Sequence, residues 1–173
     1  GDRGASSLDW AIMTGQTMWG VTVLQAPAEM DPGAIWASYN FALSGSSIAK
    51  SSVYRRQVTK AAVRAVLEAV QKFQLRQFRP EPLDYSSADV IGCWRPRMRQ
   101  SDRAIDWNRN STMEIVAKIS AADSTPGVLD TLLGKTCFLY GAHVEDRLKG
   151  PTGKIIARRD GASGRSGVNR SGV

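Results

Sequence analysis

The chain has 173 residues, of which 42% are hydrophobic and 23% charged, and this suits one compact domain or two small ones with a buried core. No apolar run approaches the roughly 20 residues of a membrane-spanning helix, and the first residues lack the basic start and apolar block of a secretory signal. The two cysteines, Cys93 and Cys137, form no CxxC motif. A disulfide scaffold and a cysteine zinc site are therefore not expected, and a reducing cytoplasm is the predicted location.

The net charge of +7 is concentrated in two stretches. Residues 147–173 carry seven basic side chains against one acid, and residues 55–103 carry eleven against five, so each stretch contributes +6. Much of this basicity lies in a tail rich in Gly, Ser and Arg. Because net charge bears on association rather than on fold, it is weak support for nucleic-acid binding.

The first part of the chain predicts a short helix and a hairpin. Residues Ala5–Met13 are typical of a short helix, and the β-branched run Trp19–Ala26 is typical of a strand. A second strand is expected over Ala34–Leu43. The turn Met30–Gly33 between them contains Pro and Gly, which allow a tight reversal.

A long helix is predicted over Ser51–Phe78, ended by Pro80 and Pro82. Its apolar residues recur every three or four positions and predict one stripe that faces the core. The stripe comprises Tyr54, Val58, Ala62, Val66, Val70 and Phe73. The following residues, 81–92, turn polar and contain Pro and Ser, which indicates a linker between domains.

The second unit is smaller. A helix is expected over Ser111–Ala121, with Ser111 or Thr112 near its N-cap, followed by short strands at Val128–Leu133, Thr136–His143 and Lys154–Arg158. Several short strands with one helix suggest a small barrel. The predicted division is residues 1–80 for the first domain, 81–92 for the linker, 93–160 for the barrel and 161–173 for a disordered tail.

Asp31 is the first candidate for chemistry, a carboxylate in the turn between two strands. An Asp before Pro-Gly is commonly a turn residue only, whereas an acid or base would need burial or a partner to tune its pKa. His143 is the single histidine and is interpreted as structural or exposed rather than as a general base. No metal site is predicted, and the sequence contains no GxGxxG, P-loop, GxSxG or HExxH motif.

Four arginines follow Trp94 in the stretch CWRPRMRQSDR: Arg95, Arg97, Arg99 and Arg103. Guanidinium groups at this spacing can clamp phosphates, which would suit a phosphate-bearing cofactor or a tRNA. A solvated linker has the same appearance, so both interpretations stay open.

The ordered blocks between Arg3 and Gly33 resemble the formyltransferase family that includes methionyl-tRNA formyltransferase. That family carries an Arg-Gly, a short helix ending in Trp-Ala-Ile, a Gly, then Gly-Val-Thr and an Asp-x-Gly turn. The matching residues here are Arg3, Gly4, Trp10, Ala11, Ile12, Gly15, Gly20, Val21, Thr22, Asp31 and Gly33. SDRAIDW and STPGVLDTLLGKTCFLYGAH are similar to the family's C-terminal domain. The resemblance implies an α/β fold, the C-terminal part of a Rossmann-like formyltransferase core followed by a small OB-like β-barrel domain.

Four segments resemble still more closely the HypX/HoxX type of nickel–iron hydrogenase maturation protein: GDRGASSLDWAI, AEMDPGAIWA, PEPLDYS and GAHVEDRLKG. In that branch a formyltransferase module precedes a crotonase-like module. The resemblance implies transfer of a formyl group from 10-formyltetrahydrofolate to coenzyme A, and a supply of carbon monoxide for the hydrogenase. It implies the downstream module and the maturation machinery as partners, and no metal, membrane or nucleic acid.

The resemblance also assigns roles to residues. Asp31 matches the family's catalytic Asp, with Arg3, Gly4 and Gly33 shaping the adjoining substrate loop. The four arginines Arg95, Arg97, Arg99 and Arg103 become candidate contacts for the coenzyme A phosphates. The family's catalytic Asn and His lie upstream of the Arg-Gly block, so we expect a fragment that is inactive alone. Two alternatives remain, a methionyl-tRNA formyltransferase and a non-catalytic basic binding module.

Overall fold

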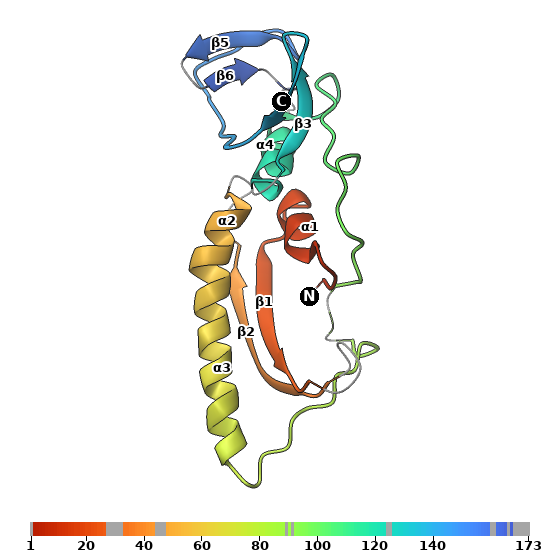
Figure 1. The fold of residues 1–173 in the computed structure, drawn as a ribbon, viewed down its shortest axis with the longest axis vertical. Helices are drawn as coiled ribbons and strands as arrows, with labels where there is room; N and C mark the ends of the chain where they lie inside the picture. Colours follow the sequence, from red (N-terminus) through yellow and green to blue (C-terminus); the bar gives the residue numbers. More distant parts are fainter. Residues whose placement is uncertain are drawn as a thin grey trace.

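The protein is an elongated α/β molecule (Figure 1). The computed structural model describes residues 2–26, 33–43, 48–88, 90, 92–123, 126–159, 162–165 and 167. The elements are, in chain order, α1 (Ser7–Met13), β1 (Met18–Leu24), β2 (Ile35–Ala42), α2 (Lys50–Val53), the π-helical turn η1 (Tyr54–Val58), α3 (Thr59–Gln74), α4 (Thr112–Ala121), β3 (Val128–Leu132), β4 (Lys135–Leu139), β5 (Ile155–Arg159) and β6 (Ala162–Arg165).

Strands β1 and β2 form the predicted antiparallel hairpin. Its two faces differ because side chains alternate along a strand. Val21, Val23 and Tyr39 lie on the face that packs against α3, around the buried Ala37. The opposite face is polar, and the hydroxyls of Thr22 and Ser38 are 3.1 Å apart across the two strands.

The predicted long helix is present as α2, η1 and α3, which run on as one helix because the backbone stays right-handed at each junction. The expected core stripe is wrong. The buried residues of α3 are Ala61, Ala65 and Ala69, whereas Val66 and Val70 are about half exposed. Alanine side chains occupy the contact because the helix lies close along the hairpin (Figure 1), which leaves no room for larger side chains.

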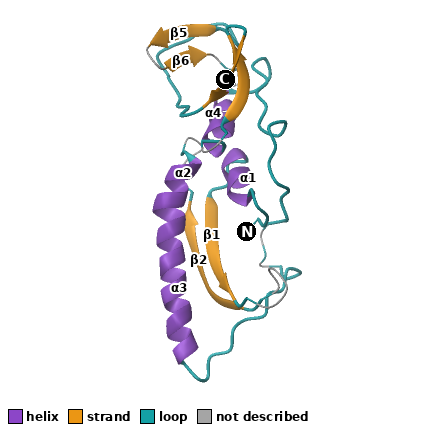
Figure 2. Cartoon of the chain, viewed as in Figure 1, coloured by secondary structure: helices purple, strands orange, loops and turns teal. Residues whose placement is uncertain are grey.

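A long segment without regular structure joins α3 to α4 (Figure 2). Backbone pairing nevertheless attaches it to the first part of the chain. Ile35 and Glu81 exchange two backbone hydrogen bonds, of 2.7 and 3.0 Å, and Arg3 pairs in parallel with Trp94. The predicted linker, residues 81–92, lies within this segment.

Helix α4 joins the two halves of the molecule. It begins with a capping box, in which Ser111 accepts from the Glu114 N–H and the Glu114 carboxylate accepts from the Ser111 N–H, so the predicted N-cap is confirmed. At its end, Ala121 belongs to the core formed with Ala11 and Ile12 of α1. Other α4 residues belong to a second core with Val128 of β3.

The predicted OB-like barrel is not confirmed. In the part of the chain that the structure describes, the strands form three separate two-stranded sheets, β1–β2, β3–β4 and β5–β6. No strand in this part of the chain pairs with a strand of another hairpin, and a barrel would need the hairpins to join edge to edge. The α/β class holds.

Four residues of the expected disordered tail form a strand. β6 pairs with β5, and the Arg165 side chain donates to the Gly153 carbonyl at 2.7 Å. Composition alone does not predict such a strand, because the strand forms by pairing with β5. Among the described helices, none has the length and apolar character to cross a membrane.

Candidate functional site

The Arg3-Gly4 segment is held as an added strand beside residues 93–95. Arg3 N–H donates to the Cys93 carbonyl at 2.9 Å, and Arg95 N–H donates to the Arg3 carbonyl at 2.7 Å. Gly4 has φ of +108°, and a Cβ there would lie 2.2 Å from the Arg95 carbonyl oxygen. Only glycine allows this close approach of two backbones.

A buried carboxylate lies beneath this pairing. The Asp2 side chain is 1% exposed and accepts from Arg95 Nε at 2.8 Å, from Cys93 N–H at 3.0 Å and from Gln16 Nε2 at 3.2 Å. Burial acts to raise the pKa of the Asp2 carboxyl, but these hydrogen bonds and the Arg95 charge outweigh it, so the pKa lies below its ordinary value. The ion pair stays charged and holds the segment between α3 and α4 against the start of the chain.

The same linker reaches the end of the hairpin. The Arg3 guanidinium lies 3.6 Å from the Tyr85 ring centroid, a cation–π contact, and Glu81 pairs with Ile35 at the start of β2. Gly33, two residues before Ile35, is buried. One stretch of linker therefore contacts both parts of the predicted substrate loop, around Arg3 and beside Gly33.

Asp31 lies outside the described residues. The strands that flank its turn are described, and their polar face carries Thr22, Ser38 and Asn40. Gly20 pairs with Asn40, and a Cβ on Gly20 would lie 2.2 Å from the Asn40 Oδ1 atom. A side chain in place of Gly20 would displace the Asn40 amide from this face.

The structure divides the four candidate arginines. Arg95 binds Asp2 and lies 5.9 Å from the Trp10 ring centroid. Arg103 is buried and donates to the Gly127 carbonyl at 3.5 Å. Arg97 and Arg99 are exposed, and neither side chain has an ion pair with another described residue. Two of the four therefore serve the fold, and two face solvent.

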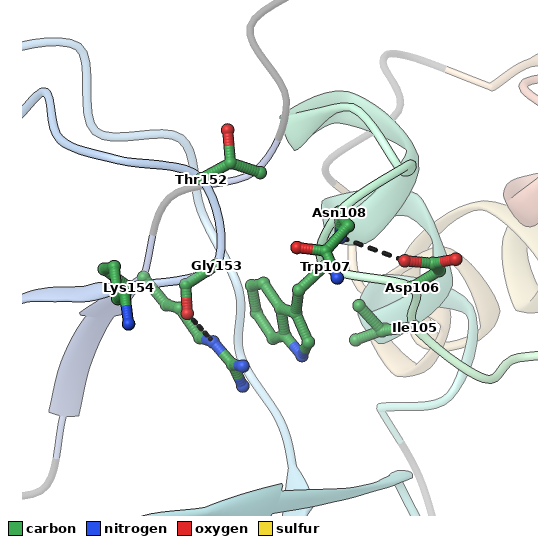
Figure 3. A pocket seen from close by; sticks show the side chains of 8 residues that line it. Ile105, Asp106, Trp107, Asn108, Thr152, Gly153 and Lys154 are labelled. Atoms are coloured by element: carbon green, nitrogen blue, oxygen red, sulfur yellow. Dashed lines mark hydrogen bonds between the residues drawn. The ribbon is translucent and has the colours of Figure 1, made fainter.

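A shallow cavity of about 570 Å³ lies in the C-terminal part (Figure 3). The Arg165 guanidinium stacks 3.9 Å from the Trp107 ring centroid, and both side chains bind Asp130, at 2.7 Å from Trp107 Nε1 and 3.3 Å from Arg165 Nη1. The lining residues are Ile105, Asp106, Trp107, Asn108, Thr152, Gly153, Lys154 and Arg165. Trp107, the last residue of the SDRAIDW stretch, thus contacts both β3 and β6.

His143 lies in the loop after β4 and is exposed. The described residues contain no group of three His, Cys, Asp or Glu side chains that could hold a metal ion. Sequence reasoning missed the Asp2 carboxylate, because a single acid at a chain position without periodicity carries no signal of burial. It also missed the Thr22–Ser38 pair, which strand alternation after Gly20 could have indicated.

The comparisons with known proteins cover nearly the whole chain. Residues 97–164 match the family model "Formyl transferase, C-terminal domain". The hydrogenase maturation factor HoxX of Bradyrhizobium diazoefficiens is 42% identical over 169 residues, which are 98% of this chain and 29% of HoxX. The crystal structure of HypX from Aquifex aeolicus in complex with tetrahydrofolic acid superposes with a TM-score of 0.83 at 40% identity, over 96% of this chain and 28% of HypX.

A more distant relative is methionyl-tRNA formyltransferase of Geobacter metallireducens, 26% identical over 92% of this chain and 49% of that protein. The chain thus spans less than a third of HoxX and about half of the tRNA enzyme. These similarities confirm the resemblance seen in the blocks around Arg3, Gly33 and Trp107. Residues 97–164 match the formyl transferase C-terminal domain, and nearly the whole chain is similar to HoxX, to HypX and to methionyl-tRNA formyltransferase.

Proposed function

We propose that this chain is part of a folate-dependent formyltransferase that serves nickel–iron hydrogenase maturation. The observation that carries the proposal is the 42% identity with HoxX over 98% of the chain. The match to folate-bound HypX supports it, because the superposition covers 96% of the chain rather than one motif. The identity with methionyl-tRNA formyltransferase is lower, at 26%.

The donor is 10-formyltetrahydrofolate and the acceptor is coenzyme A. The acceptor sulfur attacks the formyl carbon, a C–S bond forms, and the bond from that carbon to N10 of the folate breaks. The thiol proton moves to N10, so the products are formyl-coenzyme A and tetrahydrofolate. Negative charge builds on the formyl oxygen on the way, and a fixed donor and a tuned acid or base lower the barrier.

Asp31 is the residue that handles the proton. Support comes from the described surroundings of its turn, since Gly33 is buried and the neighbouring strands present the polar side chains of Thr22 and Ser38. Arg3, Gly4 and Gly33 shape the substrate loop beside it, with the Arg3 backbone fixed by residues 93–95.

The Asp31→Asn variant tests this role in the protein that carries the chain. We expect kcat for formyl transfer from 10-formyltetrahydrofolate to coenzyme A to fall by about 100-fold or more, while tetrahydrofolate affinity by calorimetry changes little. Asp146→Asn, on an exposed loop, is the matched control. Unchanged kcat would show that Asp31 has no role in the transfer. Formylation of initiator methionyl-tRNA rather than coenzyme A would show that the acceptor is the tRNA.

The exposed Arg97 and Arg99 are the arginines available for the coenzyme A phosphates. Charge reversal to Glu at both positions should weaken coenzyme A binding by about tenfold or more, since charge-assisted contacts to phosphate are lost. Arg109→Glu, at a side chain that is 87% exposed, is the control. Equal affinity in variant and wild type would assign these arginines to the solvated surface.

In this proposal a crotonase-like module of the same protein then releases carbon monoxide from the formyl thioester for the hydrogenase. The reaction belongs in the cytoplasm, where thiols such as the free Cys93 and Cys137 stay reduced. Carbon monoxide released from formyl-coenzyme A by the protein, trapped on a haem protein, is the expected readout.

A further inference from the structure

The face of α3 that points away from the hairpin is large and apolar. It carries Val63, Val66, Leu67 and Val70, of which Val66 is 49% exposed. At its edge lies Phe73, which is 75% exposed and whose ring also contacts Trp36 of β2 at a centroid distance of 5.8 Å. The spacing of the five α3 residues by three and four positions places them on one continuous side of the helix. We call these five residues the outer face of α3.

Three of the four charged side chains of α3 bind the hairpin or one another, and the fourth, Lys60, is exposed. Arg64 donates to the Tyr39 hydroxyl at 2.5 Å, and Lys72 donates to the Trp36 carbonyl at 3.1 Å. Glu68 pairs with Lys72 at 2.6 Å. None of the five outer-face residues is charged. A helix on a finished protein surface shows the reverse order, with apolar residues inward and charges outward.

We infer that the outer face of α3 is an internal interface, covered by an apolar and uncharged layer of the same polypeptide outside residues 1–173. Contiguous apolar surface of this kind marks an interaction site. More than two thirds of HoxX and of HypX lies outside the part matched by this chain, so relatives of this fold contain the polypeptide that such a layer requires. The absence of charge on the face argues against a nucleic acid or another highly charged partner.

Thiol labelling in the complete gene product tests the inference. Val66→Cys and Val70→Cys report on the outer face, and Lys60→Cys, at an exposed position of the same helix, is the matched control. The labelling rate is read by mass spectrometry of the α3 peptide, which separates it from Cys93 and Cys137. We expect Lys60→Cys to react rapidly and both outer-face cysteines at least about 100-fold more slowly, because reaction requires the covering layer to open.

Two results would overturn the inference. Reaction of the outer-face cysteines as fast as Lys60→Cys would show that the face is free in solution. Protection that appears only as protein concentration rises, together with a dimer by light scattering, would assign the face to a second copy of the chain. Rapid reaction at Lys60→Cys with native circular dichroism shows that the variants are folded, so slow labelling reports burial.

Discussion

At the scale of single residues, the Asp2–Arg95 pair holds the segment between α3 and α4 against the start of the chain. A carboxylate that is 1% exposed is costly to bury unless its oxygens are satisfied, and here two side chains and one backbone N–H bind it. The pairing of Arg3 with residues 93–95 rests on this carboxylate. Two parts of the chain about ninety residues apart are thereby joined beside the predicted substrate loop.

The Asp2→Asn variant should lower the free energy of unfolding by about 1.5–3 kcal/mol at neutral pH, since hydrogen bonds to a charged group are lost. The pKa of Asp2 is lowered in the folded state from an ordinary 3.8. Its stabilisation is therefore complete above the ordinary pKa and is lost as pH falls through the lower folded value.

Urea denaturation of wild type and Asp2→Asn from about pH 7 to pH 2.5 measures this effect. The difference between the two proteins should hold to about pH 5 and shrink below 3.8. Asp146→Asn, on an exposed loop, should change stability by less than about 0.5 kcal/mol. A difference independent of pH would mean that the Asp2 charge contributes nothing.

At the scale of elements, α3 shows why helical periodicity alone does not give the buried face. The large residues Val66 and Val70 are regularly spaced, but Ala65 and Ala69 pack against the hairpin instead. The close packing of helix and hairpin requires small side chains. Beside the alanines, Arg64 binds the Tyr39 hydroxyl and Lys72 binds the Trp36 carbonyl.

Ala65→Leu should therefore destabilise the protein by about 1–3 kcal/mol, because the added atoms have no space at a position that is 0% exposed. Gln71→Leu, at an exposed position of the same helix, is the control and should change stability by less than about 0.5 kcal/mol. Thermal and urea denaturation give both values. Equal effects of the two leucines would show that α3 does not pack tightly on the hairpin.

At the scale of the whole molecule, α4 and the residue pair Asp123–Ser51 connect the formyl transferase C-terminal domain to the first part of the chain. The Asp123 carboxylate accepts from the Ser51 N–H at 3.0 Å and from its hydroxyl at 2.5 Å. It thereby satisfies free donors at the start of α2, where a negative charge is also favourable. Ala121 at the end of α4 completes the core around Ile12 and Val53.

A double-mutant cycle measures this connection. Asp123→Ala should cost about 1–2 kcal/mol, and its coupling to Ser51→Ala should be about 0.5 kcal/mol or more, because the two side chains hydrogen-bond directly. Ser52→Ala, at the next residue, has no hydrogen bond to Asp123 in the structure and should be additive. Additivity at Ser51 as well would exclude Asp123 as a link between the two parts.

The sequence by itself indicated most of the helices and strands and the resemblance to formyltransferases. Gly33 precedes β2, Ser111 marks the start of α4, and the blocks around Arg3 and Trp107 resemble formyltransferases. The long helix ends at Gln74, before the prolines that predicted its end. These features depend on local conformational preferences and on short motifs, which the chain carries wherever it folds. The roles of Asp31 and the exposed arginines stay predictions.

Only the tertiary structure decided which residues are buried and which strands meet. The alanine face of α3 and the buried Asp2 carboxylate depend on partners that lie far away in the sequence, and the pairing of the described strands as separate hairpins depends on which strand edges meet. Burial and strand pairing are properties of two surfaces together. The residue pattern of one surface shows that it needs a partner, and only the folded structure shows which other surface is that partner.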